Sequence, residues 1–447
     1  MPARVNLLTN PSFETGVTGW TANSATLSNP VTGGLVGVRH ARLTSTVTGA
    51  AFSLVASATV PVTAGQPYSE SAYVRGTVGR SVQMRATWTG ATATLGSAAA
   101  VASTTDYQRI TLAGVVPVGA TAVRFDVLVG AAGVVVGTIL DVDACLLEAA
   151  PLGDYFDGAT ADTPTTRFDW TGAANASTST ATPWVDVSLV PSGTPNPVQI
   201  VLTGIPNGVA YEVTGTTGDG SSWPVPGGAG VSTGAQVVLV DNRSALNSPV
   251  TYTATWGGAT YTSAPIAVPY AGRAVLQSLD GQTTIPFVWR DNGDPREYVV
   301  RSVAFDIPNR ARPAIRYATG GDGGGTLQIR TARTASAELV NALRTGRPLV
   351  LRTDGAIRDI PAVEIILIRA ASNRSWGAIT APGVVSADRV WDLPYILVDD
   401  PEPGTALAAW SWDDFDAAMA TRTWADHDAL FAGSTWDAWD TYPWGQL

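Results

Sequence analysis

Alternating apolar and polar residues fill most of the first 150 positions. Runs with a period of two recur at 52–55, 68–75, 81–88, 108–112 and 122–129, between clusters of Gly, Pro, Ser or Thr. Short runs at this spacing are typical of an all-β sandwich. In the last run, 138–148, the alternation predicts one face with Leu140, Val142, Ala144 and Leu146, and an opposite face with Asp141, Asp143 and Cys145.

A second β-rich region spans 185–270. It holds five or more strand-like runs in roughly eighty residues, with a tight turn at 206–208. This pattern favours a small immunoglobulin-like sandwich.

The region 271–400 combines strands with one predicted helix, from about Ala337 to Arg344. Ser336 is expected to cap its N-terminus, Glu338 to lie in its first turn, and Gly346 to end it. Leu339, Val340 and Leu343 form the apolar face of this helix. The glycine run at 320–325 is expected to be a hairpin tip, since no helix follows it as a phosphate loop would require. One helix with a mostly antiparallel sheet is an α+β arrangement.

Two stretches lack any core-forming period. Residues 155–180 are rich in Thr, Ala and Ser with four aromatic residues, which predicts an ordered connector that packs by a few rings. From 401 onward Trp and Asp dominate, and Trp412, Trp424 and Trp436 recur twelve residues apart. Each repeat can start a helix too short to be stable alone. We expect these three Trp residues to be buried at an interface, with packing on their own domain as the alternative.

Composition excludes several functions. All 27 basic residues are Arg, so no chemistry that needs a lysine is available. His40, His427 and Cys145 are the only His and Cys residues, too few for a zinc finger or a disulfide framework. The net charge of −10 argues against nucleic-acid binding. The first residues, MPARVNLLTNPSF, lack the apolar run typical of a signal peptide, and no apolar run is long enough to span a bilayer, so we expect no membrane insertion.

Several short motifs resemble phage proteins. YFDG at 155–158, WTG at 170–172 and ASTS at 176–179 resemble a segment of minor tail proteins (baseplate or tail tip) of tailed phages of high-GC bacteria. In those proteins the segment follows a carbohydrate-binding-like jelly roll, and NLLTNPSFETGVTGW at 6–20 is similar to the opening of such modules. Residues 271–400 resemble the tail-tube and distal-tail β-barrel domains that carry one helix.

The resemblance implies a mainly β chain of five parts. These are a carbohydrate-binding-like jelly roll at 1–150, an ordered linker at 151–184, an immunoglobulin-like β-sandwich at 185–270, a tail-tube-like β domain with one helix at 271–400, and a Trp/Asp repeat tail at 401–447.

Candidate sites follow from these expectations. A sugar platform would use Trp20, Tyr73, Trp88 or Tyr107, although strand aromatics more often belong to a core. Jelly rolls of this kind often hold a structural calcium, which the resemblance assigns to Glu14 with Asp141 or Asp143. Solvated acidic residues at a sheet edge are the alternative. No other cofactor is expected.

The expected function is that of a structural virion component, not an enzyme. It would be assembled in the host cytoplasm, mount on the tail tip beside other tail proteins as a homo-oligomer, by resemblance a trimer, and contact host surface glycans. Arg316 and Arg330 are expected at the assembly interface because Arg favours interface ion pairs. A tail-associated glycan hydrolase or depolymerase and a secreted bacterial adhesin are the alternatives, and no carboxylate pair in the sequence identifies a hydrolase site.

Overall fold

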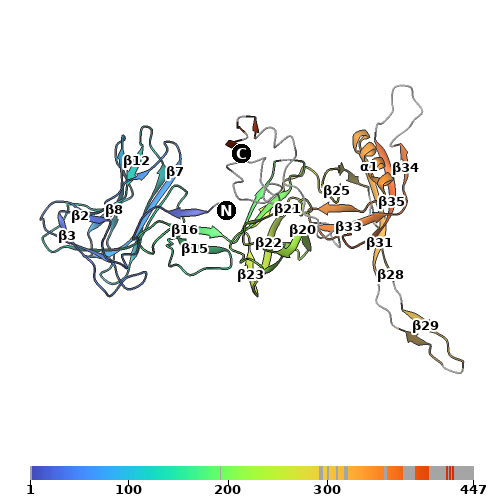
Figure 1. Ribbon diagram of the computed structural model, residues 1–447, viewed down its shortest axis with the longest axis horizontal. Coiled ribbons are helices and arrows are strands. Elements are labelled where there is room, and N and C mark those ends of the chain that lie inside the picture. Colours follow the sequence, from blue (N-terminus) through green and yellow to red (C-terminus); the bar gives the residue numbers. More distant parts are fainter. Residues whose placement is uncertain are drawn as a thin grey trace. The chain divides into compact units, whose positions relative to one another are not determined.

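The computed structural model describes residues 3–191, 193–290, 295–299, 302–308, 311–316, 321–356, 360–375 and 388–401, with a few positions between 419 and 426. Strands dominate these residues and α1 (Arg333–Thr345) is their one named helix, which confirms a mainly β chain (Figure 1). The chain forms two compact units, Met1–Pro183 and Trp184–Leu447. Among the described residues, no helix has the length and apolar character needed to cross a membrane.

The first unit is a β-sandwich. One sheet has the path β2 (Trp20–Asn23), β5 (Phe52–Ala56), β13 (Asp126–Val129), β8 (Ser81–Thr89), β12 (Ala122–Arg124) and β6 (Val60–Pro61), with β9 (Thr94–Leu95) and β10 (Ala99–Ala100) paired to β8. The other sheet has the order β11 (Gln108–Val115), β7 (Pro67–Gly76), β14 (Ile139–Glu148), β4 (Ala41–Ser45) and β3 (Ala25–Ser28). A small third sheet joins β1 (Arg4–Asn6), β16 (Ser179–Pro183) and β15 (Thr166–Trp170).

The core of the first unit lies between the two large sheets. Alternate residues of each strand point into it, for example Val82 and Met84 of β8 and Ala72 and Val74 of β7, all fully buried. Because successive side chains of a strand point to opposite faces, the intervening residues of β7 lie on the outer face of the five-stranded sheet.

The predicted alternation fails in the middle of β14. A β-bulge shifts the register between Asp143 and Leu146, and Ala144 has a φ of 48°. Since a bulge adds one residue to one strand, it exchanges the two faces beyond it. Cys145 and Leu147 therefore enter the main core, while Leu146 packs on the opposite side against Phe156.

The connector at 155–180 packs as predicted by a few rings. Phe156 and Ala181 are buried with Leu146, and Tyr155 and Phe168 pack against them. Asn6 links this segment to the sheet, because its amide nitrogen donates to the carbonyl oxygens of Cys145 and Phe156.

The second unit begins with a smaller sandwich. Its sheets are β17 (Val185–Leu189), β18 (Val198–Leu202) and β21 (Val237–Asp241), and β20 (Ser222–Val231), β19 (Ala210–Thr217), β22 (Pro249–Trp256) and β23 (Ala259–Thr262), with β24 (Ile266–Ala267) on β22. Trp256 and Tyr261 stack at one side of its core, and Trp184 packs edge-on against Trp256 and at a tilt against Tyr261.

A nine-stranded sheet completes the second unit. Its path is β26 (Thr284–Pro286), β25 (Ala274–Ser278), β32 (Leu349–Thr353), β33 (Val363–Ile368), β35 (Arg389–Leu397), β31 (Gly321–Thr331) and β27 (Val288–Trp289), with β28 (Arg296–Val299) on β31 and β34 (Ser372–Ser375) on β35. A separate hairpin pairs β29 (Val303–Phe305) with β30 (Ala314–Arg316). The path is open at β26 and β27, so the described residues form no closed barrel.

Helix α1 packs on this sheet by the predicted face, but it begins earlier than predicted. Leu339 is fully buried, and Gly346 ends the helix with a φ of 65°. Ser336 is not the N-cap, because the helix starts at Arg333 and the Ser336 hydroxyl donates back to the Ala332 carbonyl. The first turn accordingly holds no acidic residue.

A buried arginine joins the smaller sandwich to the nine-stranded sheet. Arg352 of β32 is fully buried; its Nε donates to the Ser244 carbonyl at 2.8 Å and its Nη1 to Gln277 Oε1 at 2.8 Å. Burial lowers the pKa of Arg352 to about 10, and the nearby charge of Asp241 opposes that shift. Asp241 is itself buried and accepts hydrogen bonds from Trp223 and Tyr252.

Replacing Arg352 by alanine should destabilise the second unit by about 3–5 kcal/mol, because the buried Asp241 then loses its compensating charge. Scanning calorimetry should show that unit's transition lowered by roughly 6 °C or more. Arg273→Ala is the matched control: the Arg273–Asp354 pair is largely exposed at its arginine, so its loss should leave the transition nearly unchanged. Equal shifts for both variants would contradict a structural role for Arg352.

Candidate carbohydrate-binding face

The outer face of the five-stranded sheet carries a cross-strand ladder of polar and aromatic residues. Asp141 of β14 lies opposite Arg75 of β7 on one side and Arg42 of β4 on the other. One pair further along, Tyr73 of β7 lies between Arg109 of β11 and Asp143 of β14. Directly opposite side chains in a sheet are in contact range, so these form two adjoining rows.

Two tyrosines of this face are covered by arginine side chains. The guanidinium carbon of Arg75 lies 4.5 Å from the centre of the Tyr107 ring, and that of Arg109 lies 5.7 Å from the Tyr73 ring. Both rings are only partly buried. The predicted platform residues Tyr73 and Tyr107 are therefore brought together, each with a cation–π partner.

Trp20 and Trp88, the other two predicted platform residues, belong to the core. Trp20 packs on Phe13 and Phe125, and its Nε1 donates to the Asn10 carbonyl at 3.1 Å. Trp88 packs edge-on against Tyr68. Both indoles are at most 6% exposed, since they occupy inward positions of their strands, so neither ring offers a surface to a sugar.

Asp141 is the electrostatic centre of the ladder. Its carboxylate accepts from Arg42 Nε at 2.6 Å and from Arg75 Nε at 3.1 Å, and lies 3.3 Å from His40. Burial by itself would raise the pKa of Asp141, but the hydrogen bonds from Arg42 and Arg75 and the nearby His40 hold it below its ordinary value. Asp141 therefore stays ionised and fixes both arginines.

Glu14 and Asp143 hold a loop over one end of the face. Asp143 Oδ2 accepts from the backbone amides of Leu35 and Val36, and Glu14 Oε1 accepts from those of Val38 and Arg39. The Tyr107 hydroxyl donates to the Gly33 carbonyl in the same loop. The segment 33–39 is thus fixed by two carboxylates.

These contacts do not fit the calcium site that the resemblance implies. Calcium takes six to eight oxygen ligands, whereas N–H donors face Glu14 and Asp143, and Asp141 is engaged by arginines. The part of the chain that the structure describes contains no cluster of three or more His, Cys, Asp or Glu side chains suited to a metal.

Sequence reasoning missed the arginines of the ladder. Arg75 and Arg109 lie in the predicted runs 68–75 and 108–112, whereas Arg42 lies outside every predicted run. Their pairing with Asp141, Tyr107 and Tyr73 depends on the strand order β11-β7-β14-β4, which the alternation does not contain.

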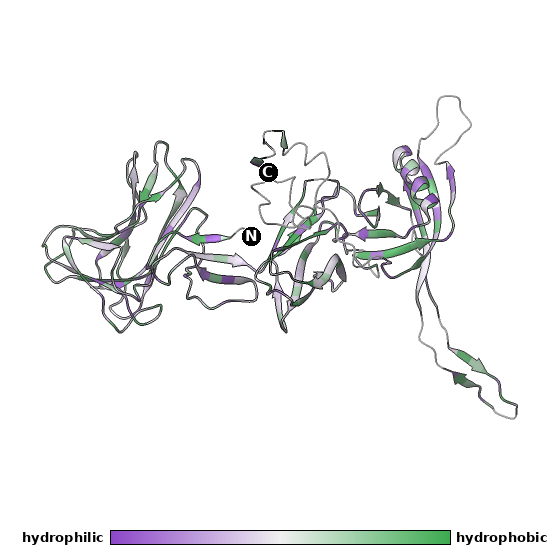
Figure 2. Cartoon of the chain, viewed as in Figure 1, coloured by the Kyte–Doolittle hydropathy of each residue, from purple (hydrophilic) through white to green (hydrophobic). Residues whose placement is uncertain are grey.

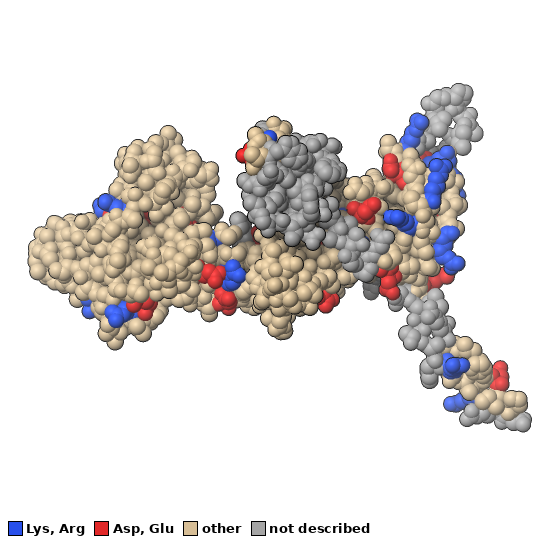
Figure 3. All heavy atoms as spheres, in the orientation of Figure 1, with Lys and Arg blue, Asp and Glu red and all other residues tan. Residues whose placement is uncertain are grey.

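The predicted interface residues fall in different places. Arg330 lies 3.8 Å from Asp388 of its own chain. Arg316 is exposed at the end of β30. Trp412, Trp424 and Trp436 lie outside the described residues. Figure 3 shows Arg side chains gathered around α1, β34 and β35 on the visible face of the second unit.

The second unit contains an apolar hairpin, here called the arm. The arm is the hairpin of β29 and β30, residues 302–316 without 309–310, and Figure 2 shows its strands as hydrophobic. Val303 and Phe305 are each 50% exposed and Ile315 is 56% exposed. An isolated two-stranded hairpin is marginally stable in water, and the described residues leave these apolar side chains about half exposed.

No protein family and no curated protein matches the sequence. Several solved structures resemble part of the chain. TmCBM61 in complex with β-1,4-galactotriose has 17% identity over 32% of this chain and 97% of its own, with a TM-score of 0.26. The CBM22-1 xylan-binding domain of Paenibacillus barcinonensis Xyn10C has 14% identity over 34% and 99%, with a TM-score of 0.27. The enzymatically active domain of tailspike protein 4 of bacteriophage CBA120 has 14% identity over 32% and 21%, with a TM-score of 0.26.

Asp143 should titrate near neutral pH. Burial raises its pKa to about 7, although hydrogen bonds from Val36, Ala144 and Leu35 oppose this rise. Because the folded pKa exceeds the unfolded value of about 3.9, its contribution to stability is complete below about pH 4 and is lost as the pH rises through 7. Carbon-13 NMR of the Asp143 carboxyl group should show a midpoint near 7, while Asp141 stays ionised from pH 4 upward.

The same titration tests the calcium prediction. A bound cation would favour the charged carboxylate and move the Asp143 midpoint below its ordinary value. We expect the same midpoint with calcium and with chelator. A midpoint that falls only when calcium is present would restore the calcium site.

Proposed function

We propose that the first unit binds host surface glycans and that the chain is a structural component of a phage tail. The observation that carries the glycan proposal is the pairing of Tyr73 and Tyr107 with Arg109 and Arg75 on one sheet face. Aromatic rings stack on the apolar faces of sugar rings, and guanidinium groups donate to hydroxyl oxygens. Each ring is still partly exposed beside its guanidinium group, so a sugar would meet the uncovered part of the ring and the arginine donors together.

The proposed activity is binding without hydrolysis. A glycosidase needs one carboxylic acid and one carboxylate that can both reach the scissile bond. Asp141 is 2% exposed and Asp143 is fully buried, and their oxygens are engaged by arginine and backbone donors. This geometry favours a binding face over the alternative of a hydrolase.

The experiment measures binding of the full chain to host cell-wall polysaccharide together with the release of reducing ends. Tyr73→Ala should weaken binding by roughly fivefold, because losing one stacked ring costs about 1 kcal/mol. Tyr73→Phe should retain binding, and Tyr211→Ala, at a partly buried tyrosine of the second unit, is the matched control. Undiminished binding by Tyr73→Ala would remove the ladder from the proposal, and release of reducing ends would favour the hydrolase.

The tail role rests on the sequence resemblance and on the apolar arm. The arm exposes Val303 and Phe305 on one face and Ile315 on the other, as its register requires. Arg316 lies opposite Val303 at the end of the hairpin, and the chain as a whole is acidic. We propose that the arm packs on a second copy of this chain within a homotrimer mounted on the tail tip, beside other tail proteins in the virion.

Polar substitution of the arm tests this assembly. The triple variant Val303→Thr, Phe305→Ser and Ile315→Thr should shift the particle mass in light scattering from three chains to one, because the buried apolar contact is lost. Val115→Thr with Val118→Thr, at exposed valines of the first unit, is the control and should keep three chains. A wild-type chain that is monomeric at micromolar concentration, or an arm variant that still assembles, would contradict the proposal.

A further inference from the structure

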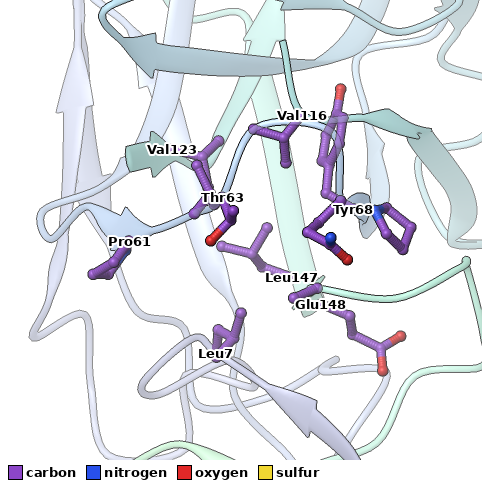
Figure 4. A pocket seen from close by; sticks show the side chains of 12 residues that line it. Leu7, Pro61, Thr63, Tyr68, Val116, Val123, Leu147 and Glu148 are labelled. Carbon is purple, nitrogen blue, oxygen red and sulfur yellow. The ribbon is translucent and has the colours of Figure 1, made fainter. Parts of the chain in front are cut away.

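A separate cavity of about 260 Å³ lies at one end of the first unit's sandwich. Its walls come from both large sheets, through the ends of β6, β7, β12 and β14 and the loop after β11. Figure 4 shows Val116, Val123, Thr63 and Leu147 around this space, with Tyr68 beside it. None of the ladder residues lines it.

The floor of the cavity is apolar and fixed. Val123 is fully buried, Leu147 is 1% exposed and Val116 is 3% exposed. The Tyr68 ring packs edge-on against Trp88, with ring centres 4.7 Å apart and an angle of 87°. A floor held by the core is already formed before any ligand arrives, so binding costs little reorganisation.

The cavity presents no unpaired charge. Its only charged residue is Glu148, which is 1% exposed and paired to Arg4 through two hydrogen bonds of 2.8 and 2.7 Å. Glu148 therefore adds no free charge to the cavity wall. The occupant must be neutral, because an anion would approach the Glu148 carboxylate and a cation would have to compete with Arg4.

Two polar side chains border the mouth. Thr63 and Gln66 lie in the exposed turn between β6 and β7. A hydrogen bond from the backbone N–H of Gln66 to the backbone carbonyl of Thr63 closes this turn. Their side chains accept or donate hydrogen bonds and, being exposed, can turn toward a bound hydroxyl group. The cavity thus offers an apolar floor and a hydrogen-bonding rim.

We infer that this cavity is a second ligand site, which takes one neutral sugar ring such as the terminal residue of a glycan. The ring's apolar face would lie on the partly exposed Leu7 and Val62 side chains, above the buried floor, and its hydroxyl groups would meet Thr63 and Gln66. Pockets for larger ligands have volumes of about 300–1,000 Å³. The cavity of about 260 Å³ is slightly smaller, and its size suits a single sugar ring. This inference does not depend on the sheet face, because the two sites share no residue.

Saturation-transfer difference NMR on the full chain with glucose, galactose and N-acetylglucosamine tests the inference. At least one neutral sugar should show transfer to the protons of its apolar face, and glucuronic acid should show at least fivefold less. Val62→Trp, which fills the cavity from its partly exposed wall, should abolish the transfer. Val118→Trp is the matched control, since Val118 is 93% exposed at the same end of the sandwich and should leave the signal unchanged.

Two further variants distinguish failure of the cavity proposal from misfolding of Val62→Trp and from failure of the sheet-face proposal. Gln66→Ala should weaken binding at least threefold without touching the core, so it remains informative if Val62→Trp misfolds. Tyr73→Ala should leave the monosaccharide signal intact even where it weakens polysaccharide binding. No transfer from any neutral sugar, or equal transfer in wild type and both cavity variants, would overturn the second site while leaving the sheet-face proposal standing.

Discussion

The β-bulge at Ala144 is the constraint on which the first unit depends. Before the bulge, β14 turns Asp141 and Asp143 to the outer face, where Arg42 and Arg75 hold one and the 33–39 loop holds the other. After it, the same face receives Leu146, on which Phe156 packs. One inserted residue therefore divides a single sheet face into a charged half and an apolar half that docks the connector. Without the bulge, Leu146 would enter the core and the connector would lose its apolar support.

The period-two pattern of the sequence located several strands of the first unit correctly. The runs at 52–55, 68–75 and 81–88 coincide with β5, β7 and β8. The period failed where tertiary contacts override it. The glycines at 321–325, expected at a hairpin tip, instead form the start of strand β31. The neighbouring backbones approach this strand so closely that only glycine fits: a Cβ at Gly323 or Gly324 would clash with the carbonyl oxygen of Glu297 or Tyr395. Such a close approach of backbones leaves no periodic signal.

The candidate site was predicted in part, for a similar reason. Tyr73 and Tyr107 were predicted as platform residues because they are aromatic, but residue type alone cannot distinguish these partly exposed tyrosines from the buried Trp20 and Trp88. Strand parity does separate Trp88: Val82, Met84 and Trp88 share one parity and one core. The arginine partners and the cavity beside Tyr68 depend on strand order and on how the two sheets meet at their ends, which arises only from long-range packing.

Because the chain has no lysine, arginine serves two different physical roles inside its units. Arg75 and Arg109 lie over tyrosine rings, which a planar, weakly hydrated guanidinium does better than an ammonium group. Arg352 is buried at the centre of the second unit, where its several donors satisfy Ser244 and Gln277 at once. Both roles use the side chain internally, as does Arg330 with Asp388. Of the two arginines predicted for an interface, only Arg316 lies on the apolar arm, where it is exposed. A positive charge and exposed apolar side chains therefore lie next to each other on the arm.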